Sequence, residues 1–403
     1  MAETSTIPNG IHVTSKPPGP TTPWHAPGPA AFDFRSDVVT TPTFSMLTAI
    51  QQTTLLDDVF AEDLTTNDLQ SRIAQLTGFP ASLLVLSGTM GNQISLRVHL
   101  TQPPHSVLCD HRSHILEWEA GGVASLCGAL VKGVVPKNGN SLTLEDVKKN
   151  AILSDDIHAC PTKVISLENT LGGEILPLEE CRKISEFARE RSIKMHLDGA
   201  RLWEAVSAQV SQGKHSGSLE TGLKAYCQYF DSVSLCFSKG LGAPIGSIIA
   251  GSDAFVRKAL HIRKSIGGGL RQAGVVTAAA RVAVEETFLG GKLEASHQRA
   301  RVIGDIWIQK GGKLAKQAET NMCWFDLEDA GISVPEFVEI GVKHGVKFLG
   351  GRLVVHYQIS DEAVRRLEKV MDEVLLAKKR GKEVQMSNGV KEEAKKVVEP
   401  EME

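Results

Sequence analysis

Ser232-Val-Ser-Leu-Cys-Phe-Ser-Lys239-Gly-Leu-Gly-Ala-Pro-Ile-Gly246 is an apolar run that ends in a lysine and a glycine-rich turn. The residues up to Ser238 predict a strand, and the glycines and Pro244 that follow break regular structure. Glycines also let the backbone pass close to a ligand. Most lysines are solvated surface charges, so Lys239 becomes a candidate Schiff-base nucleophile only in the context of the rest of the chain.

A second segment, Ile193-Lys-Met-His-Leu-Asp198-Gly-Ala-Arg201, is a short hydrophobic run that ends in an acid. Taken alone, Asp198 fits a helix cap. An aspartate at the carboxyl end of a strand also lies where open α/β sheets bind ligands. Paired with Lys239, it predicts a pyridoxal phosphate site, because that cofactor needs a lysine for its aldehyde and an anion for its ring nitrogen.

A third segment, Leu83-Leu-Val-Leu-Ser87-Gly88-Thr89-Met-Gly91-Asn92, has the form of a phosphate site: an apolar strand, a small polar turn and a helical continuation. Backbone N–H groups at the start of a helix bind a dianion well. The chain contains no G-x-x-x-x-G-K-[ST] sequence, and the lysine loop lacks G-x-G-x-x-G spacing, so nucleotide-binding folds are not supported.

Between residues 32 and 275, strand-like and helix-like patterns alternate, which predicts an α/β fold with a mainly parallel sheet. Longer amphipathic helices follow and predict a smaller C-terminal α/β domain over residues 276–377. The first 31 residues are rich in Pro, Ser, Thr and Gly and are expected to form a disordered arm. Residues 378–403 are mainly Lys, Glu and Val and are expected to form a disordered charged tail.

The composition of the 403-residue chain excludes several classes of protein. A net charge of −3 gives no nucleic-acid signature, and the apolar runs are of strand length, so we expect no membrane span. No secretory signal is recognised, so a cytoplasmic protein is expected. The seven cysteines are odd in number and show no C-x-x-C spacing, which indicates reduced core residues and neither a metal site nor a disulfide framework.

With these motifs in order, the chain resembles the low-specificity L-threonine aldolases, and in particular their fungal members. These are pyridoxal-phosphate enzymes of the aspartate-aminotransferase fold (fold type I). The resemblance covers roughly residues 33 to 376. Besides the three segments above, it rests on Asp33–Pro42, Asp57–Asp63, Glu119–Gly122, Ile165–Thr170 and Gly267–Gln272.

The resemblance implies roles for individual residues. For the cofactor it implies Lys239 as the Schiff-base lysine, Asp198 as the ring-nitrogen partner, His114 stacked on the ring, and a set around the phosphate and ring that comprises Ser87, Gly88, Thr89, Arg201 and Arg271. The phosphate that Arg271 reaches belongs to the same or a neighbouring subunit. For the substrate carboxylate it implies Ser36, Arg201 and Arg352, and His158 matches a second active-site histidine. It also implies a homodimer or homotetramer with active sites at subunit interfaces.

The implied reaction is aldol cleavage of L-threonine or L-allo-threonine to glycine and an aldehyde such as acetaldehyde, with His158 or His114 as the base. Two departures from the family pattern keep a second reaction open. Phe60 and Ala61 stand where many aldolases have Tyr-Gly, and residues 171–173 are Leu-Gly-Gly where a histidine is common. The alternative is an alanine racemase that supplies D-alanine for fungal peptide biosynthesis. A non-catalytic scaffold is a third hypothesis, which the retained Lys239, Asp198 and Arg352 disfavour.

Overall fold

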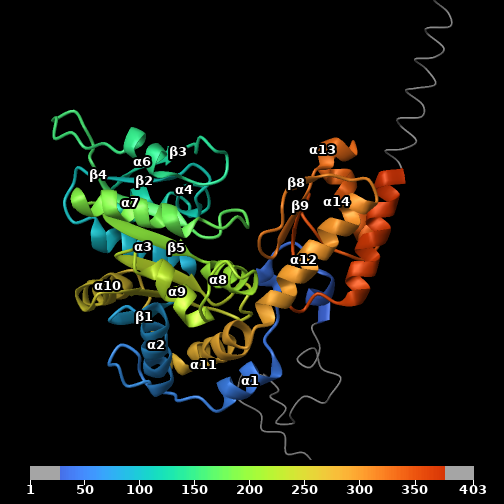
Figure 1. Cartoon of the computed structure of the whole chain (residues 1–403). Coiled ribbons are helices and arrows are strands. Elements are labelled where there is room, and N and C mark those ends of the chain that lie inside the picture. Colours follow the sequence, from blue (N-terminus) through green and yellow to red (C-terminus); the bar gives the residue numbers. More distant parts are fainter. Residues whose placement is uncertain (1–27, 377–403) are drawn as a thin grey trace, which may run out of the picture.

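A seven-stranded sheet forms the centre of the larger of two lobes in the computed structural model, which describes residues 28–376 (Figure 1). The strand order is β1-β7-β6-β5-β4-β2-β3, and β7 alone runs antiparallel to its neighbours. The central strands are short apolar runs buried on both faces, as expected for a sheet covered by helices on each side. The strands are β1 Ala81–Val85, β2 Ser106–Asp110, β3 Leu130–Val134, β4 Thr162–Glu168, β5 Lys194–Gly199, β6 Ser232–Cys236 and β7 Ser247–Gly251.

Helices cover both faces of this sheet. One face packs against α3 and α10, and the other packs against α2, α7, α8, α9 and α11 in the main apolar core. The helices of the larger lobe are α1 Phe44–Gln51, α2 Leu64–Thr77, α3 Gly88–His99, α4 His114–Glu117, α5 Gly122–Cys127, α6 Leu144–Asn150, α7 Leu178–Glu190, α8 Leu202–Ser211, α9 Leu219–Cys227, α10 Asp253–Ser265 and α11 Gly274–Val282. A π-helical segment, Ala283–Leu289, continues α11. The predicted mainly parallel α/β fold is confirmed.

The smaller lobe has its own apolar core around a three-stranded antiparallel sheet of order β10-β9-β8. Its elements are α12 Lys292–Gln309, β8 Leu314–Lys316, β9 Met322–Phe325, α13 Leu327–Ala330, α14 Val334–Lys343, β10 Arg352–Val354 and a helix over residues 361–376. The last helix buries Leu367, Val370, Met371 and Val374, as its sequence pattern predicts. In Figure 1 the long helix α12 runs from the larger lobe into the smaller one.

The two cores do not divide at residue 275, and the predicted boundary needs correction at both ends. Ala279, Ala280 and Phe288 belong to the core of the larger lobe, so the change of core falls within α12. At the other end, Phe34 is fully buried in the core of the smaller lobe. The sequence pattern identified amphipathic helices here correctly, but amphipathicity alone does not say which core a helix faces.

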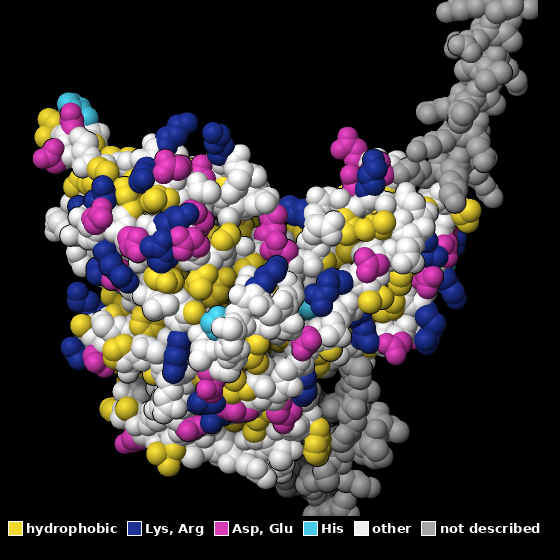
Figure 2. Space-filling view, viewed as in Figure 1, with side chains coloured by type: hydrophobic (Ala, Val, Ile, Leu, Met, Phe, Trp, Pro, Cys, Tyr) yellow, Lys and Arg dark blue, Asp and Glu magenta, His cyan; other side chains and the backbone are white. Residues whose placement is uncertain are grey.

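The predicted disordered arm and tail fall largely on residues 1–27 and 377–403, outside the described residues. Residues 28–31 are an exception, because they belong to a 3₁₀ helix, Gly28–Phe32, in which Ala30 and Ala31 are buried. Within the described residues, no helix is both long and apolar enough to cross a membrane. On the face shown in Figure 2, Lys and Arg side chains are interspersed with Asp and Glu, without a broad basic region.

Candidate active site

Several of the predicted site residues gather at one edge of the large sheet. Because β1, β2, β4, β5 and β6 are parallel to one another, their carboxyl ends lie at the same edge. Ser87 follows β1, His114 follows β2, Glu168 ends β4, Asp198 lies at the end of β5 and Lys239 follows β6. This is the edge at which open α/β sheets bind their ligands.

Lys239 lies on a tight turn between β6 and β7. The Gly242 N–H donates to the Lys239 carbonyl over 2.8 Å, and Ala243 N–H donates to the Phe237 carbonyl over 3.0 Å. Gly242 has a φ of +83°, and a Cβ there would lie 2.2 Å from the Tyr357 hydroxyl oxygen, so only glycine fits. The half-buried Lys239 side chain makes no hydrogen bond or ion pair to any described residue, which leaves its amine available to a ligand.

Asp198 is buried, and its carboxylate is held by two donors. Asn92 Nδ2 donates to Asp198 Oδ2 over 2.7 Å, and the Ala200 N–H donates to Oδ1 over 3.1 Å. The same Asn92 nitrogen donates to Glu119 Oε1 over 2.8 Å. Asn92 therefore joins the two carboxylates through one amide group.

His114 is tied to this pair through Glu119. Its Nδ1 lies 2.8 Å from Glu119 Oε1, and its side chain keeps about a third of its surface exposed at 36%. The hydrogen bond to Glu119 raises the pKa of His114 above its usual 6.5; burial and the charge of Lys239 oppose the shift, and the charge of Asp198 adds to it. The ring is thus accessible, oriented and more basic than a free imidazole.

Glu168 lies beside these groups and was not among the predicted site residues. It pairs in register with Asp198 on the next strand, and it accepts a hydrogen bond from the His114 N–H over 2.8 Å. Burial and then the charge of Asp198 raise the pKa of Glu168 to about 8, against the opposing effects of the His114 hydrogen bond and Lys239. The site therefore contains a carboxyl group whose raised pKa favours its protonated form.

Arg201, predicted to hold the substrate carboxylate, is engaged by a buried aspartate. Its Nε donates to Asp37 Oδ2 over 2.9 Å and its Nη2 donates to Oδ1 over 2.7 Å. Burial raises the pKa of Asp37, but the charge and hydrogen bonds of Arg201 lower it by more. The charge of Lys239 and a hydrogen bond from Asn321 add to this, so the pKa of Asp37 is held well below its usual range. This bidentate pair fixes the guanidinium and leaves Nη1 outside the pair.

Arg352 and Ser36 lie next to that ion pair. Burial and the neighbouring charge of Arg201 lower the pKa of Arg352, and Asp37 opposes this shift. Arg352 makes no hydrogen bond or ion pair to any described residue. Ser36 Oγ donates to Asp37 Oδ1 over 3.4 Å. Of the three residues predicted to bind the substrate carboxylate, Arg352 is therefore the cation whose N–H donors are not used by another described residue.

The start of α3 offers the expected phosphate cradle. Ser87 caps the helix, its Oγ accepting from the Met90 N–H over 3.1 Å, and the helix extends for 12 residues from Gly88. Its N-terminal amides and dipole favour an anion. An unpaired lysine amine, a buried carboxylate with fixed donors and this helix start are the three parts that pyridoxal phosphate requires, so the residues present fit that cofactor.

One predicted residue, His158, is not brought to the site of its own chain, and a second, Arg271, is paired elsewhere. His158 lies on a loop before β4, at the opposite edge of the sheet from Lys239; its side chain is 87% exposed and pairs with Asp156 over 2.8 Å. Its assignment as a base within its own chain is therefore wrong. Arg271 is 60% exposed and pairs with Asp57 over 2.7 Å, so any phosphate contact from it remains a prediction.

The two departures from the family pattern have different surroundings. Phe60 is 71% exposed, so its side chain lies on the surface of this chain. The Leu-Gly-Gly stretch instead packs against the smaller lobe: Trp324 Nε1 donates to the Gly172 carbonyl over 2.9 Å. Gly173 has a φ of +89°, and a Cβ there would lie 2.7 Å from Met322 Cβ. The glycines at 172 and 173 thus allow a close contact between the lobes beside the site.

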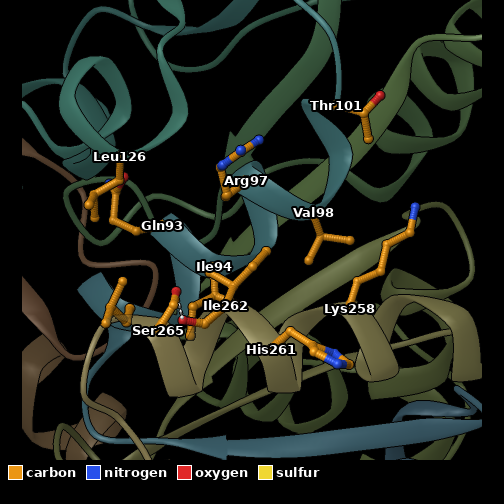
Figure 3. A pocket seen from close by; sticks show the side chains of 11 residues that line it. Gln93, Ile94, Arg97, Val98, Thr101, Leu126, Lys258, His261, Ile262 and Ser265 are labelled. Atoms are coloured by element: carbon orange, nitrogen blue, oxygen red, sulfur yellow. Dashed lines mark hydrogen bonds between the residues drawn. The ribbon is translucent and has the colours of Figure 1, made fainter.

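Two further features have the form of ligand sites. Ligand atoms of His114, Glu119 and Asp198 lie within 4.8 Å of one another, as a metal site would require, but each of these residues is already hydrogen-bonded within the cluster that includes Asn92. A separate surface hollow of about 600 Å³ lies between α3 and α10, where Arg97, Lys258 and His261 surround an apolar floor (Figure 3). It does not include Lys239.

Comparison with known proteins agrees with this geometry. The sequence pattern of the beta-eliminating lyase family matches residues 33–330. The aldolase vrtJ of Penicillium aethiopicum is 57% identical over 356 residues, which is 88% of this chain and 89% of the relative. The low-specificity L-threonine aldolase of Candida albicans is 49% identical over 349 residues, 85% and 90% of the two chains. The alanine racemase TOXG of Cochliobolus carbonum is 43% identical over 360 residues, 88% and 90%.

Among solved structures, the threonine aldolase of Leishmania major superimposes with a TM-score of 0.71 over 85% of this chain and 99% of that chain. At 18% identity, this similarity concerns the fold alone. It confirms the predicted fold type, and the sequence matches confirm the predicted relationship. The chain therefore belongs to the beta-eliminating lyase family and is similar over most of its length to fungal low-specificity L-threonine aldolases.

Proposed function

We propose that this protein is a pyridoxal-phosphate-dependent lyase that cleaves L-threonine and L-allo-threonine to glycine and acetaldehyde. The observation that carries the proposal is the convergence of Lys239, Asp198 and His114 at one sheet edge, next to the uncommitted guanidinium of Arg352. The 49% identity to a low-specificity L-threonine aldolase over 85% of the chain supports the substrate class.

Family membership and the three-part site support the cofactor. Bound pyridoxal phosphate supplies an aldehyde that links to an amine and a ring that withdraws electrons from the substrate α-carbon. Lys239 provides the amine, Asp198 the anion for the ring nitrogen, and Ser87, Gly88 and Thr89 the phosphate contacts.

Substrate orientation follows from the charges around Arg352. A carboxylate can take two parallel hydrogen bonds from a guanidinium, and Arg352 has both free. Arg201, fixed by Asp37, adds Nη1 from the side, and Ser36 adds a hydroxyl. Two cations held around one anion give the amino acid a single orientation at the site.

Proton transfer is assigned to His114 and Glu168. Of the two candidate histidines, His114 is proposed as the base that accepts the β-hydroxyl proton, because it is accessible and Glu119 orients it. Glu168, whose raised pKa favours its protonated form, can return a proton to the product. The reaction then uses two groups of one site in different roles, His114 as proton acceptor and Glu168 as proton donor.

The racemase remains the second candidate because of the 43% identity to an alanine racemase. Racemisation needs only removal and return of the proton at the α-carbon, which His114, Glu168 and Lys239 could perform. Purified protein given L-threonine, L-allo-threonine and L-alanine in parallel distinguishes the two. The expected result is acetaldehyde with an equal amount of glycine and no D-alanine. D-alanine without acetaldehyde would contradict the proposed aldolase activity.

A homo-oligomer is also proposed, and an exposed apolar surface supports it. Exposed hydrophobic side chains gather in the stretch from α1 to the start of α2: Phe44, Leu55, Leu56, Phe60 and Leu64. Such patches mark interaction surfaces. Sedimentation should show a dimer or tetramer that Phe60→Lys weakens, and a monomeric wild type would contradict the proposal. A cytoplasmic location stays a prediction.

A further inference from the structure

A continuous line of hydrogen bonds runs from Asp198 through the interior of the larger lobe to the opposite edge of the sheet. Asn92 Nδ2 lies 2.7 Å from Asp198 Oδ2, and Asn92 Oδ1 lies 3.1 Å from His196 Nε2. His196 Nδ1 lies 2.9 Å from Ser232 Oγ, which lies 2.7 Å from His99 Nε2. Asn92, His196 and Ser232 are at most 1% exposed.

The carboxylate end fixes the direction of every bond in the line. Asp198 and Glu119 both receive their bonds from Asn92 Nδ2, so Asn92 Oδ1 must face His196 as an acceptor. His196 Nε2 therefore carries the hydrogen. Burial lowers the pKa of His196 to about 3, so the ring is neutral and its Nδ1 accepts from the Ser232 hydroxyl. Ser232 Oγ then accepts from His99 Nε2, and all four donors point toward Asp198.

This alignment of donors holds the Asn92 amide in one orientation. An amide is nearly symmetric in shape, and only the His196 N–H distinguishes its oxygen from its nitrogen on the buried side. If the amide turned over, its oxygen would face the carboxylates of Asp198 and Glu119 and would repel both. Donors aligned in one direction also polarise one another in a medium of low dielectric constant.

We propose that His99, Ser232 and His196 are positioning residues that act through Asn92 to hold the Asp198 carboxylate ionised and correctly oriented for the cofactor. The inference rests on the proposed use of pyridoxal phosphate, but not on the identity of the amino-acid substrate. None of the three residues needs to touch cofactor or substrate. Their contribution reaches the site only through the Asn92 amide.

The line ends near the surface. His99 stacks on Phe255 at a centroid distance of 5.3 Å and lines a hollow of about 510 Å³ beside the ion pair of Lys194 with Asp231. Burial lowers the pKa of His99 to about 4; Asp231 opposes this shift, and Lys194 and Lys258 add to it. The outermost member is thus neutral at physiological pH and keeps its donor role.

Ser232→Ala tests the proposal, because Ser232 Oγ is the atom that joins the two histidines. Ser185→Ala is the matched control: Ser185 is a buried serine on α7 whose hydroxyl has no hydrogen-bond partner among residues 28–376. Ser232→Thr restores the hydroxyl and serves as the rescue. Each full-length protein is titrated with pyridoxal phosphate in the absence of any amino acid. The dissociation constant, the visible absorbance band of the Lys239-bound cofactor and the thermal midpoint are measured.

We expect Ser232→Ala to weaken cofactor binding by about 2- to 10-fold, the range of one net hydrogen bond, and to shift the visible band. Ser185→Ala should leave both unchanged, and Ser232→Thr should restore both. A Ser232→Ala protein that loses thermal stability but keeps the wild-type dissociation constant and band would overturn the proposal. Failure of the aldolase assignment alone would leave these measurements unaffected, whereas a wild type that binds no pyridoxal phosphate overturns both.

Discussion

Arg201 and Asp37 form a bidentate ion pair across 164 residues of sequence, with N–O distances of 2.9 and 2.7 Å. Asp37 enters from a segment that first pairs with the smaller lobe, where the Phe34 N–H donates to the Lys347 carbonyl over 2.7 Å. Arg201 follows β5 in the larger lobe. The pair therefore connects the two lobes at the site where the substrate carboxylate is expected.

Asp37→Asn should destabilise the protein and weaken substrate binding, because it leaves a buried guanidinium without its counter-ion. Losing one partner of such a pair costs about 3 kcal/mol of unfolding free energy. The pKa of Asp37 is lowered in the folded protein, so its stabilisation is present above its usual value of 3.8 and is lost as pH falls further. Urea unfolding should thus separate mutant from wild type at pH 7, and the difference should shrink steadily as the pH falls below 3.8 toward the lowered pKa of Asp37. A difference that stays constant throughout the acid range below 3.8 would contradict the ion-pair explanation.

Glu119→Gln should change the pH profile of the reaction. The bond to Glu119 raises the pKa of His114, and a base must be deprotonated to act, so wild-type kcat/KM rises through that raised pKa. Removing the carboxylate lets the pKa of His114 fall toward 6.5 and moves the acidic limb of the profile to lower pH. Glu117→Gln, an exposed neighbour on α4, is the control. If His114 only stacks on the cofactor and is not the base, Glu119→Gln will leave the acidic limb of the kcat/KM profile where it is in the wild type.

Gly173→Ala should destabilise the contact between the lobes. Alanine at a φ of +89° costs about 1 kcal/mol, and its Cβ would meet Met322 at 2.7 Å, which adds about 1 to 3 kcal/mol of overpacking. Gly139→Ala separates the two effects, since Gly139 has a φ of +76° with no atom within 4 Å of an added Cβ. The thermal midpoint should drop further for Gly173→Ala; equal drops would mean that backbone strain alone is responsible.

The sequence predicted those parts of the site that lie in continuous motifs. Lys239, Asp198 and Ser87 each follow an apolar strand, so their placement at one sheet edge follows from a parallel sheet. Asp37 and Asn92 were missed as site residues because their roles depend on partners more than 100 residues away. Glu168 has a signal in the sequence, because its Glu-Asn dipeptide at the end of β4 lies within the Ile165–Thr170 motif.

The predictions that failed did so for related reasons. A histidine in a polar loop, such as His158, carries no periodicity that tells which edge of a sheet it meets. The boundary near residue 275 was misplaced because the small apolar residues of α11 suit either core. Phe34, the second residue of the Asp33–Pro42 motif, packs into a core built mostly from residues beyond 300.

The central claim is that Lys239 binds the cofactor covalently, and chemical trapping tests it most directly. Purified protein saturated with pyridoxal phosphate is reduced with borohydride, digested and analysed by mass spectrometry, with Lys239→Ala treated in parallel. We predict one pyridoxyl phosphate adduct, on the peptide that contains Lys239, and no adduct of similar yield in Lys239→Ala. The Lys239→Ala protein should also lack turnover of L-threonine while keeping the circular dichroism spectrum of the wild type. A stoichiometric adduct on another lysine, or an unmodified Lys239 in an active enzyme, would contradict the account.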